Sequence, residues 1–221
     1  DLHSNPLYTG GGRLCLNGEE LQGRLVVPDD VDVIGHAAFC NCRGLTEVVI
    51  GNATIQIGER AFQGCSGLMS IIVEDDNPAY KSENGLLLSK DGTSLVQGVN
   101  GNVTIPNSVT NISSYAFYGC TNLTNIAMTD SVTGIGSYAF YGCGGLASVT
   151  IPGGVTSIGD CAFCNCANLR SFMVAEGSTT YKSVSGLLLS KGGESLLFGV
   201  NGDVTIPEGV TNIANKAFYY C

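Results

Sequence analysis

The chain has 221 residues, a net charge of −9, and ten lysines and arginines that are scattered along its length. Nucleic acids and anionic membrane surfaces attract clustered basic residues, so neither is expected as a partner. No apolar run approaches the ~20 residues that a membrane helix needs, so no membrane insertion is expected within this segment.

A repeated 23-residue motif organises the chain. Its six copies share the sequence Ala-Phe-x-x-Cys and end at Cys42, Cys65, Cys120, Cys143, Cys166 and Cys221. The spacings between these cysteines are 23, 55, 23, 23 and 55 residues, so two copies carry 32 extra residues each (55 − 23). Such self-similarity is typical of a solenoid, in which each coil buries its apolar face against the next. We therefore expect a single domain over residues 1–221, with repeats 1–42, 43–65, 66–120, 121–143, 144–166 and 167–221.

The first repeat is a shortened version of the stretched copies. Asn5-Pro6-Leu7-Tyr8 matches the pattern of residues 77–80, and residues 25–28 match the pattern of residues 103–106. The chain thus begins inside a stretched repeat and ends within another. We expect it to be a segment of a longer protein.

The unit itself predicts two strands and a turn. Leu123, Ile126 and Met128 end in the period-2 alternation of a short strand. Residues 132–135 form a second extended segment, and residues 137–140 predict a short helical or 3₁₀ turn whose phenylalanine fills the coil. Stacked coils lie about 4.7–5 Å apart, so each Leu, Ile and Phe should rest on its equivalent in the next coil.

The two stretched copies align with each other without a gap. In the first, the apolar runs 86–89 and 94–99 flank Asp91-Gly92, a strong signal for a β-hairpin, and the second copy has Gly192-Gly193 there. We expect each insert to be a β-hairpin that protrudes from its coil or widens it. Elsewhere, Thr54 replaces the valine of the motif and should weaken the packing slightly.

The full pattern, L-x-x-I-x-I-P-x-x-V-T-x-I-G-x-x-A-F-x-x-C, is clearest in residues 146–166. It resembles the BspA-like, or Treponema-type, leucine-rich repeats of bacterial cell-surface proteins, over essentially the whole chain. The resemblance implies an α/β, β-rich fold: a right-handed solenoid of 23-residue coils with a parallel sheet on one side. It also implies a secreted or cell-surface location, in host-associated bacteria or protozoan parasites, and a role in adhesion. It carries over no catalytic residue.

Ten cysteines are many for this length. The six at the repeat position are best interpreted as a ladder of buried thiols, which behave as small hydrophobic side chains; some disulfides, or a metal or redox role, are the alternatives. The other four are Cys15, Cys40, Cys161 and Cys164. Cys161-x-x-Cys164-x-Cys166 superficially resembles a metal or redox motif, but a zinc site needs about four convergent ligands and no histidine lies near it in sequence. His36 is expected at a solvated corner, and neither a cofactor nor a metal is expected.

One face of the predicted sheet is the candidate binding surface. The central position of the Ile-x-Ile pattern is occupied in successive coils by Val49, Ile72, Ala127, Thr150 and Met173. A flanking row contains Glu47, Ser70, Asn125, Ser148 and Arg170. Exposed apolar residues that adjoin one another can mark a contact site. The alternative is that the hairpins partly cover this surface.

Two functions from different classes follow. The favoured one is a non-enzymatic extracellular module that binds a protein or glycan of a host or another cell through the sheet face and the hairpins, because solenoids offer extended surfaces. The other is a stalk or spacer that displays other domains and has no ligand of its own. An enzyme is not expected, since the sequence offers no convergent set of nucleophile, base and orienting group.

Overall fold

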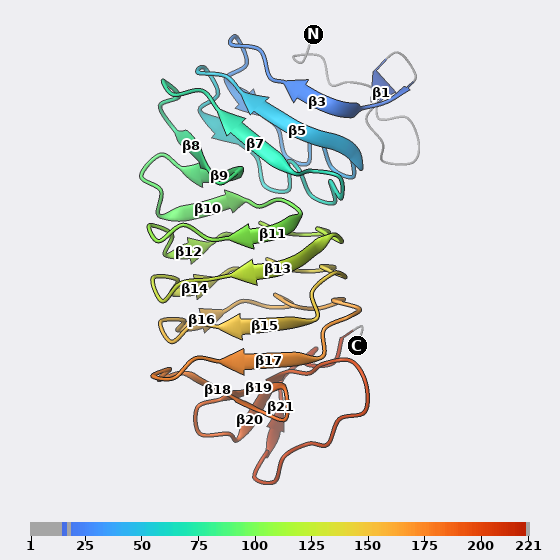
Figure 1. Ribbon diagram of the computed structural model, residues 1–221, viewed down its shortest axis with the longest axis vertical. Coiled ribbons are helices and arrows are strands. Elements are labelled where there is room, and N and C mark those ends of the chain that lie inside the picture. Colours follow the sequence, from blue (N-terminus) through green and yellow to red (C-terminus); the bar gives the residue numbers. More distant parts are fainter. Residues whose placement is uncertain (1–14, 17–18, 220–221) are drawn as a thin grey trace.

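The computed structural model describes residues 15–16 and 19–219, which form an elongated stack of coils (Figure 1). At its start, β1 (Cys15–Leu16) and β2 (Glu19–Glu20) pair antiparallel. The Asn5–Tyr8 segment of the predicted first repeat lies outside the described residues.

Seven strands form one side of the stack, which we call the first face. They are β3 (Gln22–Val26), β5 (Gly44–Ile50), β7 (Ser70–Val73), β11 (Gly101–Thr104), β13 (Leu123–Ala127), β15 (Ser148–Ile151) and β17 (Ser171–Val174). The ladders β3–β5–β7, β11–β13 and β15–β17 are parallel, and they place equivalent residues such as Val48 and Ile71 side by side. Alternate side chains point into the coil, as the period-2 pattern predicts.

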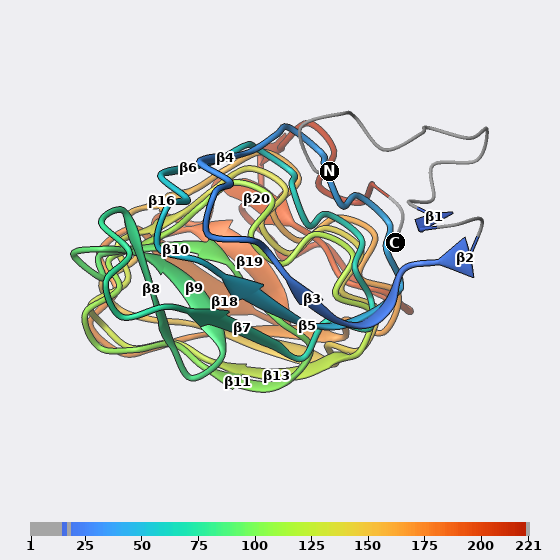
Figure 2. The ribbon, with the colours of Figure 1, turned by 90° about the horizontal axis from the view of Figure 1, so that it is seen from above.

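Shorter strands form the second face. They are β4 (Val33–Ile34), β6 (Gln56–Ile57), β12 (Asn111–Ile112), β14 (Gly134–Ile135), β16 (Ser157–Ile158) and β21 (Asn212–Ile213). The ladders β4–β6 and β12–β14–β16 are also parallel. Seen from above, the two faces lie on different sides of the coil and enclose the core (Figure 2).

The phenylalanines of the repeat stack on one another, as predicted. The ring centroids of Phe39 and Phe62 are 5.4 Å apart, and those of Phe140 lie 5.0 Å from Phe117 and 5.2 Å from Phe163. Ala139, next to Phe140 in the chain, is also fully buried.

The prediction of short helical or 3₁₀ turns is wrong, and the part of the chain that the structure describes contains no helix. Tyr138 has a φ of 57°, in the left-handed region, so a right-handed helical turn cannot pass through it. Its equivalents behave in the same way: Ala37, Arg60, Tyr115, Cys161 and Lys216. Hydrogen bonds to the next coil, such as Phe140 N–H to Ala162 O at 2.8 Å, hold this geometry instead.

Each insert forms most of a coil of its own, and does not simply add a hairpin to an existing coil. In the first insert, β8 (Tyr80–Glu83), β9 (Leu86–Ser89) and β10 (Ser94–Gln97) pair antiparallel in succession. β10 then pairs parallel with β12, with Leu95 opposite Ile112, so it occupies the second-face position of a coil that began at β7. β18 (Tyr181–Val184), β19 (Leu187–Ser190) and β20 (Ser195–Phe198) repeat the arrangement.

The 55-residue period therefore contains two coils. Ile71, Val103 and Ile126 are equivalent inward residues of β7, β11 and β13, and they are separated by 32 and then 23 residues. The additional residues of the longer coil fill its interior, since Leu86, Leu87 and Leu88 are all fully buried.

The longer coil also cuts one corner. From Leu95 to Gly98 the chain takes three residues, where the next coil takes five from Ile112 to Phe117. Gly98 N–H donates to Ala116 O (2.8 Å), just as Phe117 N–H donates to Ala139 O (2.7 Å). Gly98 thus replaces the phenylalanine of the motif, and the ring of Phe117 occupies the space above it.

Thr54 is fully buried, and its hydroxyl donates a hydrogen bond to Val31 O at 2.8 Å. This hydrogen bond offsets part of the predicted weakening, because a buried hydroxyl without a partner would cost about 1–3 kcal/mol. The Thr54 carbonyl in turn accepts a hydrogen bond from the side-chain amide of Asn77 at 2.8 Å.

Candidate binding surface

The predicted central row lies on the first face. Strand register places Val49 between Val26 and Ile72, and pairs Thr150 with Met173. Ile72 and Met173 are 39% and 50% exposed, and Ala127 and Thr150 are also exposed. The inserts do not cover these residues, because much of the added chain lies inside the coil.

Val49 is an exception. It is only 5% exposed, because branched side chains in register on both neighbouring strands, Val26 and Ile72, flank it. The expectation that Val49 offers a contact to a partner is therefore wrong.

Two members of the row were missed in the sequence. Val26 is 55% exposed at one end, and the exposed Thr104 pairs with Ala127 in the middle. Both lie in segments that had been matched to each other, Leu25–Pro28 and Val103–Pro106, so the signal was present. It was overlooked because the insert was not recognised as a separate coil.

The row is not one apolar stripe. Its large apolar members lie toward the two ends, with Val26 and Ile72 at one and Met173 at the other, and the smaller residues Thr104, Ala127 and Thr150 occupy the middle. There, for example, the Thr124 hydroxyl donates to Asn102 Oδ1 at 2.8 Å. The middle of the first face can therefore form hydrogen bonds with a partner, while the ends offer apolar contact.

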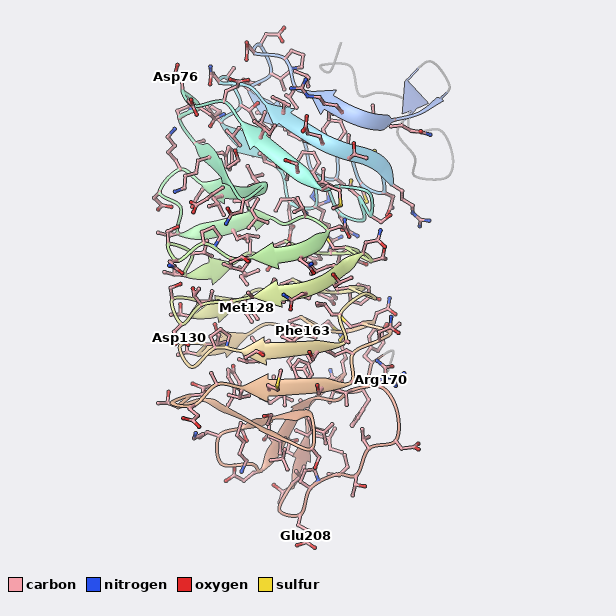
Figure 3. The ribbon with its side chains drawn as sticks, in the orientation of Figure 1. Asp76, Met128, Asp130, Phe163, Arg170 and Glu208 are labelled. Carbon is pink, nitrogen blue, oxygen red and sulfur yellow. The ribbon has the colours of Figure 1, made fainter. Side chains whose placement is uncertain are left out.

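The flanking row is mixed. Glu47 is half-buried and forms an ion pair with Arg24 at 2.7 Å, and Ser70 is half-buried beside the first insert. Asn125, Ser148 and Arg170 are exposed. Figure 3 shows Arg170 at the edge of the first face where β17 begins, and Asp130 at the opposite edge.

The five ladder cysteines that the structure describes, Cys42, Cys65, Cys120, Cys143 and Cys166, are buried, as predicted. The thiols of Cys65, Cys143 and Cys166 each donate to a backbone carbonyl 26 residues earlier at 3.1 Å. None of the eight cysteines whose side chains the structure describes forms a disulfide, and Cys15 and Cys221 are not among the eight. Burial raises the pKa of Cys120 to about 12 and that of Cys143 well above its usual value. Such thiols are protonated at neutral pH and are poor nucleophiles.

The three extra cysteines whose side chains the structure describes, Cys40, Cys161 and Cys164, do not gather into a metal site. Cys161 and Cys164 are buried in one turn, Cys40 is half-buried, and His36 is exposed as expected. Among the described residues, no three His, Cys, Asp or Glu side chains are placed to hold a metal ion. In the same part of the chain, no helix has the length and apolar character needed to cross a membrane.

Two faces of parallel strands, joined by tight turns and repeated mostly every 23 residues, define a β-solenoid of the leucine-rich-repeat class. The family model described as "BspA type Leucine rich repeat region" matches six copies over residues 15–83 and 100–185. The chain belongs to this family. The unmatched stretch between these ranges contains β9 and β10 of the first insert.

Solved structures share the fold. A leucine-rich repeat protein from Eubacterium ventriosum superposes with a TM-score of 0.69 at 24% identity, over 90% of this chain and 64% of that one. The pneumococcal vaccine antigen PcpA superposes with a TM-score of 0.50 at 15% identity, over 91% of this chain and 68% of that one. The chain thus spans less than two thirds of the E. ventriosum structure. No match to a curated protein was found.

Proposed function

We propose that this segment is a non-enzymatic binding module, outside the cell or on its surface, whose first face binds a protein or glycan of a host or another cell. The observation that carries the proposal is the row of side chains along the seven strands of the first face, from Val26 to Met173, of which all but Val49 are exposed. Solenoids use such extended surfaces for recognition.

The chemistry of the row supports this use. Protein-binding surfaces combine apolar anchors with polar groups that fix orientation. Ile72 and Met173 are candidate anchors, and the hydroxyls of Thr104 and Thr150 supply hydrogen-bonding groups between them.

The buried thiols are consistent with an extracellular location, which the family resemblance implies. Oxidising compartments convert accessible thiols to disulfides. Here the ladder thiols are buried and hydrogen-bonded, and their raised pKa values slow oxidation because the thiolate is the reactive form.

The proposal is tested by measuring binding of the protein to a panel of host matrix proteins, mucins and glycans. The variant Ile72→Asp/Ala127→Asp/Met173→Asp places three charges on the first face, and we expect saturable binding to weaken by about tenfold or more, equal to about 1.4 kcal/mol. The matched control, Asn52→Asp/Asn107→Asp/Thr179→Asp, adds three charges at exposed loop positions and should bind as the wild type does. Circular dichroism should be unchanged in both variants.

Two outcomes would contradict the proposal. Equal binding by the first-face variant and the wild type would move the site elsewhere on the molecule. No saturable binding across the panel would favour the stalk or spacer function.

A further inference from the structure

Two clefts of the same construction lie where the longer coils cut the corner. The first, of about 300 Å³, is lined by residues 57–62, 96–97 and 113–115. The second, of about 290 Å³, is lined by residues 158–161, 197–198 and 214–216, together with Tyr181. The lining segments occupy equivalent positions in the two 55-residue periods. The path of the longer coil therefore creates the cleft in both periods.

The shortened corner explains the cavity. In a 23-residue coil, the turn that ends in Ala-Phe fills the space that the cleft occupies here. The longer coil lacks this turn and passes beneath the space instead, through Val96 and Gln97 in the first cleft and through Leu197 and Phe198 in the second. The turns before and after the longer coil remain as the two walls.

The missing turn also interrupts the backbone ladder. At the other corners this ladder is regular, as in Tyr115 N–H to Ser137 O at 3.1 Å and Tyr138 N–H to Asp160 O at 2.9 Å. At the first cleft the equivalent bond, from Arg60 N–H to Ser114 O, is not formed among the described residues. A donor and an acceptor of the backbone are therefore available to a ligand there.

Each cleft combines one carboxylate, one cation and a floor that is partly apolar in the first cleft (Val96 and Gln97) and apolar in the second (Leu197 and Phe198). Glu59 and Arg60 line the first, and Asp160 and Lys216 line the second. The Arg60 guanidinium lies 4.2 Å from the ring centroid of Tyr115 and donates to its hydroxyl at 2.5 Å, which fixes one rim. Because the charges balance, neither cleft selects for an anion or a cation.

We infer that the two clefts are equivalent subsites for single saccharide residues. A sugar ring presents hydroxyl donors and acceptors around its edge and a C–H surface on its face. It therefore matches a neutral cleft whose polar walls stand beside apolar side chains of the floor, Val96 in the first cleft and Leu197 and Phe198 in the second. A volume near 300 Å³ is at the lower end for small-molecule sites, which fits one ring better than a peptide segment.

The clefts differ in a way that predicts selectivity. Phe198 and Tyr181 of the second cleft correspond to Gln97 and Tyr80 of the first period, and Tyr80 does not line its cleft. The second floor is thus more aromatic and should favour an N-acetylated sugar, whose methyl group adds apolar surface. Four coil steps separate the clefts, on the order of 20 Å, so one glycan chain can reach both.

The test is a titration of the ¹⁵N-labelled protein with galactose, mannose and N-acetylglucosamine, followed by NMR. We expect amide shifts at residues 58–61 and 113–115, and at 158–161 and 214–216, with dissociation constants of about 1 mM or weaker. Glu59→Ala/Arg60→Ala should abolish the first set of shifts alone, and Asp160→Ala/Lys216→Ala the second alone. The control Lys81→Ala/Glu83→Ala removes the same two charges from an ion pair on β8 and should change neither set.

The inference does not depend on the first face, and the first-face variant distinguishes the two claims. It should retain both sets of shifts. No shift with any of the three sugars, or shifts that persist when both clefts are altered, would overturn the inference. Sugar binding lost in the first-face variant and kept in the cleft variants would also overturn it, while leaving the proposed function intact.

Discussion

Among single residues, Gly98 and Gly199 sit where a longer coil meets the next phenylalanine ring. A Cβ atom at Gly98 would lie 2.0 Å from Phe117 Cε1, and one at Gly199 would lie 2.2 Å from Phe218 Cε1. Neither glycine is needed for a left-handed backbone, so the constraint is space alone.

The variant Gly98→Ala should therefore lose about 1–3 kcal/mol of unfolding free energy, the usual cost of overpacking a core. Urea denaturation measures the loss. The matched control is Gly144→Ala, where an added Cβ meets nothing within 4 Å, and its stability should change by less than about 0.5 kcal/mol. Equal stabilities for the two variants would mean that the Phe117 ring can move aside.

The buried thiols predict a dependence of stability on pH. The pKa of Cys120 is about 12 in the folded chain against an ordinary value of 9.0, because burial disfavours the thiolate. Between these values the unfolded chain loses the proton and the folded chain keeps it. Stability is therefore complete below pH 9 and falls as the pH rises toward 12, by at most about 1.4 kcal/mol per pH unit for one such group.

Urea unfolding in reducing buffer from pH 7 to 10.5 tests this dependence. The variant Cys120→Ala should show a shallower fall than the wild type, while lysines and tyrosines contribute equally to both curves. Parallel curves would show that Cys120 is not kept protonated by the fold.

At the scale of elements, Asn77 anchors the start of the first insert to the coil before it. Its amide donates to Gly51 O and Thr54 O, both at 2.8 Å, and its Oδ1 accepts from Ala79 N–H and Tyr80 N–H. The second insert has Ser178 instead, whose hydroxyl accepts from Tyr181 N–H at 3.2 Å.

Asn77→Ala should destabilise the protein by about 3 kcal/mol, because it leaves several buried backbone groups without partners. Asn52→Ala, at an exposed position in the same region, is the matched control and should be nearly neutral. The difference is read from urea denaturation midpoints, and a similar midpoint for both variants would refute this role of Asn77.

Strands and the phenylalanine stack were predictable because period-2 alternation and a fixed repeat determine which residues face inward. The left-handed turn was not predictable, because tyrosine and arginine do not favour a positive φ. At Tyr138 and Arg60 the hydrogen bonds between coils impose this φ. The burial of Val49 likewise depends on the strands on either side, which a single repeat does not show.

The two extra coils escaped prediction for a similar reason. The repeat was aligned on Ala-Phe-x-x-Cys, and the longer coil carries Gly98 where that motif has phenylalanine and has no cysteine after it. Asn100 is buried, and its amide donates to Leu68 O at 3.0 Å. The shared Gly-Val-Asn-Gly of residues 98–101 and 199–202 was the signal for this variant corner.

At the scale of the whole molecule, three 23-residue coils separate the two longer coils, and both candidate sites depend on that order. Longer coils interrupt the first-face ladder after β7 and after β17. On the edge that carries the Ala-Phe turns, however, the coils on either side of a longer coil already touch: Gly64 N–H donates to Tyr118 O at 3.0 Å. A longer coil should therefore be removable as a unit, but not in part.

Urea unfolding of two deletion variants is the measurement that tests whether each insert completes a coil. Removing residues 72–103 joins Ile71 to Thr104 and leaves a 23-residue coil, so we expect a single cooperative transition. Removing only residues 81–90 deletes the fully buried Leu86, Leu87 and Leu88, and we expect at least about 4 kcal/mol of lost stability or no folded protein. A stable 81–90 deletion beside an unfolded 72–103 deletion would show that the inserts are hairpins appended to existing coils, and would contradict the account.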